Sequence, residues 1–309
     1  MAALLLLAPW TAWLRGQPSP PKRRIIDVHL HAYASDASDF ERRAPNPITG
    51  IPLTATTEDA HRQATLREMD RYNVVLGVVS NGTTSIDAVR RWVAAAPTRF
   101  LAGVGFDTPD EVTPQWIRDA HRHGQLQVIG EMSPPYAGYS IGDPAYEPYF
   151  LLAEELDLPI AIHAGTGAGR AAYNAFPKYR MEFNRPLHLE DLLVKHPRAR
   201  VQLMHAGWPF LDETIALLNA HPQVYLDLGV ISWTQPRAEF HAYLRRIVDA
   251  GYGQRIMFGS DQMAWPDTIG RAIEAVESAP FLSDAQKQAI FYDNAARFLR
   301  LPERANNPQ

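Results

Sequence analysis

Eight short apolar runs recur along the chain, and they limit its fold more than any other feature. Each run is rich in Val, Ile, Leu or Phe, and amphipathic segments with a helical spacing of apolar residues separate the runs. The runs cover residues 24–32, 73–81, 100–106, 126–134, 159–165, 200–208, 224–232 and 255–262. Near-continuous apolar strands that alternate with helices indicate a parallel sheet covered by helices, and eight such units close a (β/α)8 barrel.

The intervening segments support this interpretation. Helical spacing is found in residues 60–72, 85–97, 113–124, 146–157, 186–197, 210–222 and 239–251. An open doubly wound sheet is the alternative, but no G-x-G-x-x-G pattern follows the first run. With 309 residues, of which 46% are hydrophobic, the chain is long enough for one large barrel. We therefore predict an α/β fold, a single-domain (β/α)8 TIM barrel, over residues 23–303.

The two ends of the chain are predicted to lie outside this barrel. Residues 1–22 begin with an apolar run that is too short to span a bilayer and then become Pro-rich and basic. They resemble the apolar core of a secretory signal but lack a positively charged start. They are either a (truncated) export signal, which would place the protein in the periplasm or outside the cell, or a leader of a cytoplasmic protein. Residues 304–309 are expected to form a tail.

Charge and cysteine content narrow the partners and the chemistry. The net charge of −4 and the absence of a Lys/Arg cluster give no electrostatic footprint for nucleic acid. We expect a small-molecule substrate, no nucleic-acid or membrane partner, and leave a homodimer open. The chain has no cysteine, which excludes disulfides, a thiolate nucleophile and Cys-ligated zinc. A metal ion would therefore be held by His and carboxylate side chains.

The first run carries two histidines at alternate positions, in the sequence IIDVHLHAY. Since side chains alternate between the faces of a strand, Asp27, His29 and His31 are expected to share one face. Ile26, Val28 and Leu30 are expected to share the other face. The spacing of His29 and His31 would let both bind one metal ion, with Asp27 supporting them rather than binding the metal.

Polar side chains also stand near the ends of four later runs. They are Glu131, His163, His205 and Asp261. A closed barrel brings the C-terminal ends of its strands together around one axis, so these side chains would meet the two histidines of the first run. A single His in an apolar run is most often a hydrogen-bonded core residue. Six such groups without a Lys, however, favour a divalent cation, because buried carboxylates need a compensating charge.

Motifs on these runs resemble the amidohydrolase superfamily. They are DVHLH in the first run, GE in the fourth, HAG in the fifth, HAGWP in the sixth, GSDQMAWP in the eighth, and the closing YDNAARFLRL with Asn294. More narrowly, the chain is similar to the amidohydrolase-related family of TIM-barrel metal-dependent hydrolases, whose relatives include aminocarboxymuconate-semialdehyde decarboxylase. The resemblance extends over residues 24–301 and implies a role for each of the six candidate site residues.

By this resemblance, His29, His31 and His163 would bind a divalent metal, with zinc favoured. Asp261 would be a fourth ligand or the general base beside it. His205 would bind a second metal or, in a one-metal site, polarise the substrate or share the proton transfer.

Glu131 is the ambiguous member of the set. Many superfamily members carry a carboxylated Lys on the fourth strand that bridges two metals. Glu131 could bridge two metals, bind one metal terminally, or orient a histidine. One ion and two ions therefore both remain open.

These residues predict a hydrolase that uses a metal-activated water on an amide, ester or lactone. A lyase, either a decarboxylase or a hydratase of an aromatic or unsaturated carboxylic acid, is the alternative. A non-catalytic metal-binding protein is the third hypothesis, although intact ligands and an intact Asp261 argue against it. The loop 32–58 is a candidate lid. Candidate substrate contacts, each of which could equally be a packing or solvated residue, are Tyr33, Tyr136, Tyr139, Arg170, Tyr173, Arg180, Trp208, Trp233 and Trp265.

Overall fold

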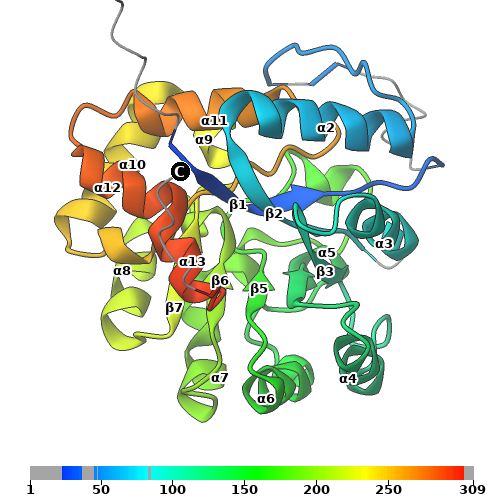
Figure 1. Cartoon of the computed structure of the whole chain (residues 1–309). Helices are drawn as coiled ribbons and strands as arrows, with labels where there is room; N and C mark the ends of the chain where they lie inside the picture. The colour runs from blue at the N-terminus through cyan, green and yellow to red at the C-terminus, as the bar shows by residue number, and fades with distance from the viewer. Residues whose placement is uncertain (1–22, 37–44, 47, 83–84, 303–309) are drawn as a thin grey trace, which may run out of the picture.

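Eight parallel strands form one sheet in the order in which they occur along the chain. The computed structural model describes residues 23–36, 45–46, 48–82 and 85–302. Helices surround the sheet on its outer side (Figure 1). The strands are β1 Ile25–His31, β2 Val74–Ser80, β3 Phe100–Phe106, β4 Val128–Met132, β5 Ile160–Ile162, β6 Val201–Leu203, β7 Val224–Asp227 and β8 Ile256–Met257. Each strand lies within one of the eight predicted runs.

Backbone hydrogen bonds between β1 and the segment that follows β8 join the two edges of the sheet. The amide of Val28 donates to the carbonyl of Phe258 at 3.0 Å, and the amide of Asp261 donates to the carbonyl of His29 at 2.8 Å. The predicted single-domain (β/α)8 barrel is therefore confirmed.

Each of the seven predicted helical segments overlaps a helix. These helices are α2 Glu58–Tyr72, α3 Ile86–Ala95, α4 Pro114–Arg122, α6 Glu147–Leu156, α7 Glu190–Lys195, α8 Leu211–Ala220 and α10 Arg237–Asp249. Of these, α2 and α10 begin two residues before the predicted segments. The sequence analysis did not place α5 Pro134–Ala137, α9 Ile231–Thr234, α11 Thr268–Glu277 and α12 Asp284–Gln288. A short π-helical turn leads from α12 into the last helix, α13 Asn294–Phe298.

The apolar core has two parts. The larger cluster packs between the strands and the surrounding helices. The smaller cluster fills the interior of the barrel with residues from several strands and from α13, among them Ile26, Val28 and Met257.

The first strand is irregular, and one expectation about it was wrong. The pairing of β1 with β2 shifts register between Asp27 and Leu30. Because the shift breaks the alternation of side chains, Val28 belongs to the inner cluster with Ile26, whereas Leu30 packs in the outer one. These three residues do not share one face.

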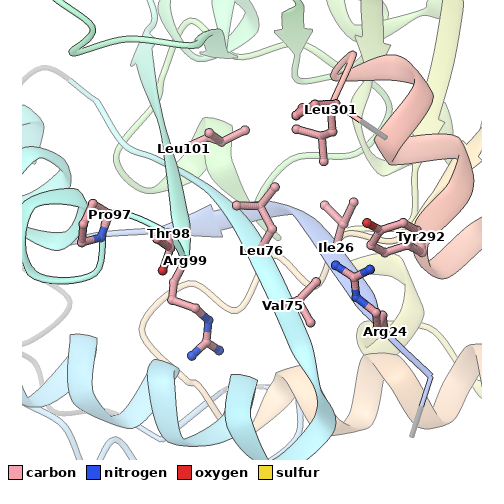
Figure 2. A pocket seen from close by; sticks show the side chains of 11 residues that line it. Arg24, Ile26, Val75, Leu76, Pro97, Thr98, Arg99, Leu101, Tyr292 and Leu301 are labelled. Carbon is pink, nitrogen blue, oxygen red and sulfur yellow. The ribbon is translucent and has the colours of Figure 1, made fainter. Parts of the chain in front are cut away.

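A hollow of about 640 Å³ opens at the N-terminal ends of β1, β2 and β3. Its walls are mainly apolar, with Ile26, Leu76 and Leu101 prominent, and the guanidinium groups of Arg24 and Arg99 lie at its edge (Figure 2). Chemistry in (β/α)8 barrels takes place at the opposite, C-terminal ends of the strands. We therefore look for the active site there.

Some predictions fall outside the described residues. These are the leader 1–22, the tail 304–309, and residues 37–44 and 47 of the candidate lid loop. No helix in the described part of the chain combines the length and the apolar character needed to cross a bilayer. The homodimer also stays a prediction.

Asn294 offers a test of how α13 is fixed to the barrel. Its buried amide nitrogen donates to the carbonyls of Ile256 at 2.7 Å and Gly253 at 2.9 Å. We expect Asn294→Ala to lower the free energy of unfolding in urea by about 2–3 kcal/mol, because it leaves buried acceptors unsatisfied. The neighbouring, exposed Asp293→Ala is the control, and an equal effect of both variants would contradict this role of Asn294.

Candidate metal centre

All six side chains predicted to form the site converge at the C-terminal ends of the strands. Two of them lie on β1 and one on β4, and the others follow β5, β6 and β8 directly or within a few residues. All are largely buried, and the most exposed side chains, those of His31 and Glu131, are each 11% exposed. They are His29, His31, Glu131, His163, His205 and Asp261.

Four donor atoms make up what we call the first donor group. The Nε2 atoms of His29 and His31 lie 3.2 Å apart, and each is 3.4 Å from Oε2 of Glu131. Oδ1 of Asp261 lies 3.1 Å from Nε2 of His31 and 3.7 Å from Nε2 of His29. Two imidazoles and two carboxylates thus face a common point.

The second donor group lies on the other side of the same glutamate. Oε1 of Glu131 lies 2.7 Å from Nδ1 of His163 and 3.6 Å from Nε2 of His205. Those two nitrogens are 3.1 Å apart. The two oxygens of Glu131 therefore divide the four imidazoles into two pairs.

The separations in the first donor group fit a divalent ion, whereas His163 and Glu131 in the second group lie at hydrogen-bond distance. Ligand atoms at the corners of a tetrahedron around zinc, about 2.0–2.1 Å from the ion, are about 3.3–3.4 Å apart. The five separations given for the first group lie between 3.1 and 3.7 Å. Imidazole nitrogens that face each other at 3.2 Å need a proton or a cation between them, since two lone pairs repel. Nitrogen and carboxylate donors without sulfur suit zinc and manganese.

The carboxylates and imidazoles of the site stabilise each other's charged forms. Burial opposes ionisation of Glu131, but hydrogen bonds with His163, His205 and His29 hold its pKa well below the ordinary value. Burial also opposes a charge on His29, yet the carboxylates of Asp261 and Asp227 raise its pKa well above the ordinary value. The carboxylates are therefore ionised at neutral pH, and the site attracts positive charge.

Two side chains hold the backbone of β1 at the site. Oδ1 of Asp27 accepts hydrogen bonds from the amides of His29 at 3.1 Å and Ser260 at 2.9 Å. Burial raises the pKa of Asp27 to about 7. The side chain of Gln262 pairs with the amide and the carbonyl of His31 at 2.9 and 2.8 Å. The supporting role predicted for Asp27 agrees with these bonds, and the sequence analysis missed Gln262.

Comparison with known proteins now identifies the family. The model of the family described as Amidohydrolase matches residues 26–301. The chain belongs to the amidohydrolase family. The resemblance inferred from the motifs of the sequence is thereby confirmed.

The similarity of this chain to a curated protein is low. Protein fluG of Emericella nidulans is 23% identical over 160 residues, which make up 47% of this chain and 18% of that protein, so the match spans about a fifth of the relative.

Two solved structures share the fold. A probable 2-pyrone-4,6-dicarboxylic acid hydrolase from Acinetobacter baumannii, crystallised with citric acid, is 16% identical with a TM-score of 0.63, covering 90% of this chain and 99% of that one. A 5-carboxyvanillate decarboxylase from Novosphingobium aromaticivorans, complexed with manganese, is 14% identical with a TM-score of 0.62, covering 90% and 96%.

Two of the predicted substrate contacts lie beside the centre. The ring of Tyr136 is 5.2 Å from that of His163, and the ring of Tyr33 is 6.1 Å from that of His31. The hydroxyl of Tyr136 accepts a hydrogen bond from the amide of Ala168 at 3.0 Å.

The other predicted contacts have different surroundings. Tyr139 packs against Tyr146, Tyr173 is 85% exposed, and Arg180 donates to the carbonyls of Pro177 and Tyr179. The indole N–H of Trp233 donates to the carbonyl of Ser260. The backbone amide of Trp208 donates to the carbonyl of His205 at 3.0 Å. Arg170 and Trp265 make no hydrogen bond or ring contact with the six site residues in the described part of the chain.

Asp107, which the sequence analysis missed, is a further carboxylate near the centre. It directly follows β3, whose Phe106 pairs with Met132 of β4, next to Glu131. Phe106 packs outward against Tyr149, so alternation directs the half-buried Asp107 toward the barrel axis. Burial and the charges of Glu111 and Glu131 raise its pKa to about 7. Among the described residues its carboxylate has no hydrogen-bond or ion-pair partner.

The raised pKa of Asp107 predicts a pH-dependent stability. Between pH 4 and pH 7 the folded state binds more protons than the unfolded state, so the stability that Asp107 contributes is present below pH 4 and is lost as the pH rises through 7. In metal-free protein, Asp107→Asn should therefore gain about 1–3 kcal/mol in unfolding free energy relative to wild type between pH 4.5 and pH 8, after allowance for solvent screening.

Urea unfolding at the two pH values measures this difference. Asp110→Asn, at a neighbouring exposed position, is the matched control and should show no such gain. A constant difference between Asp107→Asn and wild type across this range would contradict the assignment.

Proposed function

We propose that this amidohydrolase is a metal-dependent hydrolase that cleaves an amide, ester or lactone bond in a small organic molecule. The observation that carries the proposal is the position of Asp261. One of its oxygens lies 3.1 Å from Nε2 of His31, and the other lies 3.8 Å from Nδ1 of His205. A carboxylate placed between two imidazole donors, at the rim of a cation site, is suited to take a proton from an attacking water.

The two donor groups suggest two ions that share Glu131. His29, His31, Asp261 and one oxygen of Glu131 would hold the first ion. His163, His205 and the other oxygen of Glu131 would hold the second. When bound, a divalent ion such as zinc lowers the pKa of water toward ~7 and polarises a carbonyl group. Of the roles considered for Glu131, we favour bridging because each of its oxygens faces a separate pair of imidazoles.

A hydrogen bond to the backbone orients the ring of His205 as a ligand of the second ion. Nδ1 of His205 lies 3.1 Å from the carbonyl of Gly229, an acceptor that fixes the proton on that nitrogen. Nε2 is then left with a lone pair that faces His163 and Glu131. His205 stands in a left-handed conformation with φ of 56°, which costs about 1–3 kcal/mol and persists only where the surroundings impose it.

Asp261 would move protons in the reaction. Burial opposes its charge, but the imidazoles of His29, His31 and His205 hold its pKa below the ordinary value. The carboxylate is therefore ionised and can accept a proton when the water attacks. It can return that proton to the leaving amine or alcohol.

Decarboxylation of an aromatic acid is the second candidate. Solved structures with this fold include a 2,6-dihydroxybenzoate decarboxylase and the manganese-bound 5-carboxyvanillate decarboxylase. In that reaction the carbon takes up a proton as the C–CO2 bond breaks, and Asp261 could transfer this proton after taking it from solvent water. Manganese would then be an alternative to zinc.

One experiment tests the proposal and separates the two reactions. Zinc-loaded and manganese-loaded protein is incubated in H2(18)O with lactones, N-acyl amino acids, aryl esters and hydroxybenzoates. Hydrolysis predicts one 18O atom in each acid product and no CO2, and chelation should abolish turnover until metal is restored. Release of CO2 without incorporation of 18O would favour the lyase, and full activity after verified metal removal would refute both.

Replacement of Asp261 tests the proposed base. Asp261→Asn should keep the fold and bind the metal of the second donor group, while kcat falls about 10²- to 10⁴-fold because proton transfer is lost. Asp284→Asn, at an exposed position on α12, is the control. An unchanged kcat in Asp261→Asn, with metal content verified, would mean that another group is the base.

A further inference from the structure

A further buried carboxylate, that of Asp227, contacts one histidine of each donor group. Asp227 ends β7 and is fully buried, and it has no place in the chemistry described above. We propose that Asp227 is a positioning residue that holds the proton of His29 on Nδ1 and so leaves Nε2 free for the metal. The inference rests on the proposed metal-dependent function and adds a residue to which none of the comparisons assigns a role.

Three N–H donors and one imidazole nitrogen surround the two oxygens of Asp227. Oδ1 accepts hydrogen bonds from the amides of Gly229 at 2.7 Å and His205 at 3.2 Å. Oδ2 accepts one from the side-chain amide of Gln202 at 2.6 Å and lies 3.3 Å from Nδ1 of His29. One carboxylate therefore contacts residues of β1, β6 and the segment after β7, among them one histidine from each donor group.

The contact with His29 decides which nitrogen can bind a metal. A neutral imidazole carries one proton, on Nδ1 or on Nε2, and the nitrogen without it is the metal ligand. A carboxylate oxygen beside Nδ1 favours the proton there. Nε2 then presents its lone pair toward Nε2 of His31 and Oε2 of Glu131, where the first donor group converges.

Close packing holds the carboxylate and the ring together. A Cβ atom at Gly229 would lie 2.6 Å from Nδ1 of His29 and 2.8 Å from Oδ1 of Asp227. A Cβ atom at Gly259 would lie 2.9 Å from Cβ of His29 and 3.3 Å from Cβ of Asp227. The backbones of these two glycines thus pack closely against both groups, and a side chain at either position would displace them.

This arrangement requires a carboxylate rather than an amide. Oδ1 of Asp227 faces two backbone N–H groups, and Oδ2 faces the side-chain amide of Gln202 and Nδ1 of His29. An asparagine in either orientation therefore turns its NH2 group toward at least one N–H donor. If the NH2 group faces His29, Nδ1 must become the acceptor and the proton moves to Nε2, which can then no longer bind a metal. If it faces the other way, it opposes the amides of Gly229 and His205 and disturbs the turn that presents His205.

The test measures metal binding rather than turnover alone. Zinc affinity of the full chain is determined by competition with a chromophoric chelator, and the visible spectrum of the cobalt-loaded protein reports the ligand set. We expect Asp227→Asn to weaken zinc binding about 10- to 100-fold and to change the cobalt spectrum. Asp227→Ser, which removes the carboxylate without adding an amide donor, should also weaken zinc binding. This variant replaces Asp227→Asn in the test if Asp227→Asn does not fold.

Tyr243→Phe is the matched control. The buried hydroxyl of Tyr243 donates to the carbonyl of Ala206, next to His205, but does not contact Asp227 or His29. This variant should lose unfolding free energy in urea while it keeps the zinc affinity and the cobalt spectrum of wild type. A merely structural role of Asp227 would give the same pattern for Asp227→Asn and would overturn the inference. If wild type itself binds no zinc, the proposed function fails instead.

Discussion

The burial of Glu131 among four imidazoles is the interaction on which the rest of the site depends. Removing an unpaired carboxylate from water costs several kcal/mol, and the cost is met only where hydrogen bonds and opposite charge surround it. Both oxygens of Glu131 are used in this way, one toward His29 and His31 and the other toward His163 and His205. A pair of divalent ions, one on each side, would satisfy the same geometry with the imidazoles neutral.

The barrel supplies this geometry by closing. The contacts between β1 and the segment after β8 bring Asp261 to the two histidines of β1, although more than two hundred residues separate them in the sequence. The site also holds its backbone in costly conformations. Val230 and Asp261 have φ values of 54° and 50°, and such strain at non-glycine residues is typical of functional sites held by a rigid scaffold.

The fold could be predicted because each apolar run corresponds to one strand, and eight parallel strands that alternate with helices form a closed barrel. The six candidate ligands could be predicted because strand ends share one edge of a barrel. Asp227 and Gln202 could not be assigned in this way, although an acid and an amide inside apolar runs were visible signals, because their roles depend on which strands become neighbours. The irregularity of β1 could not be predicted either, because its sequence keeps the alternation of polar and apolar residues that is typical of a regular strand.

The central claim is that Glu131 separates two cation sites, and anomalous diffraction tests it most directly. Crystals of zinc-loaded protein would be measured on both sides of the zinc absorption edge. The account predicts two anomalous peaks, one at His29, His31 and Asp261 and one at His163 and His205, with an oxygen of Glu131 beside each. A single zinc peak at these residues, or none, in crystals of fully zinc-loaded protein would contradict it.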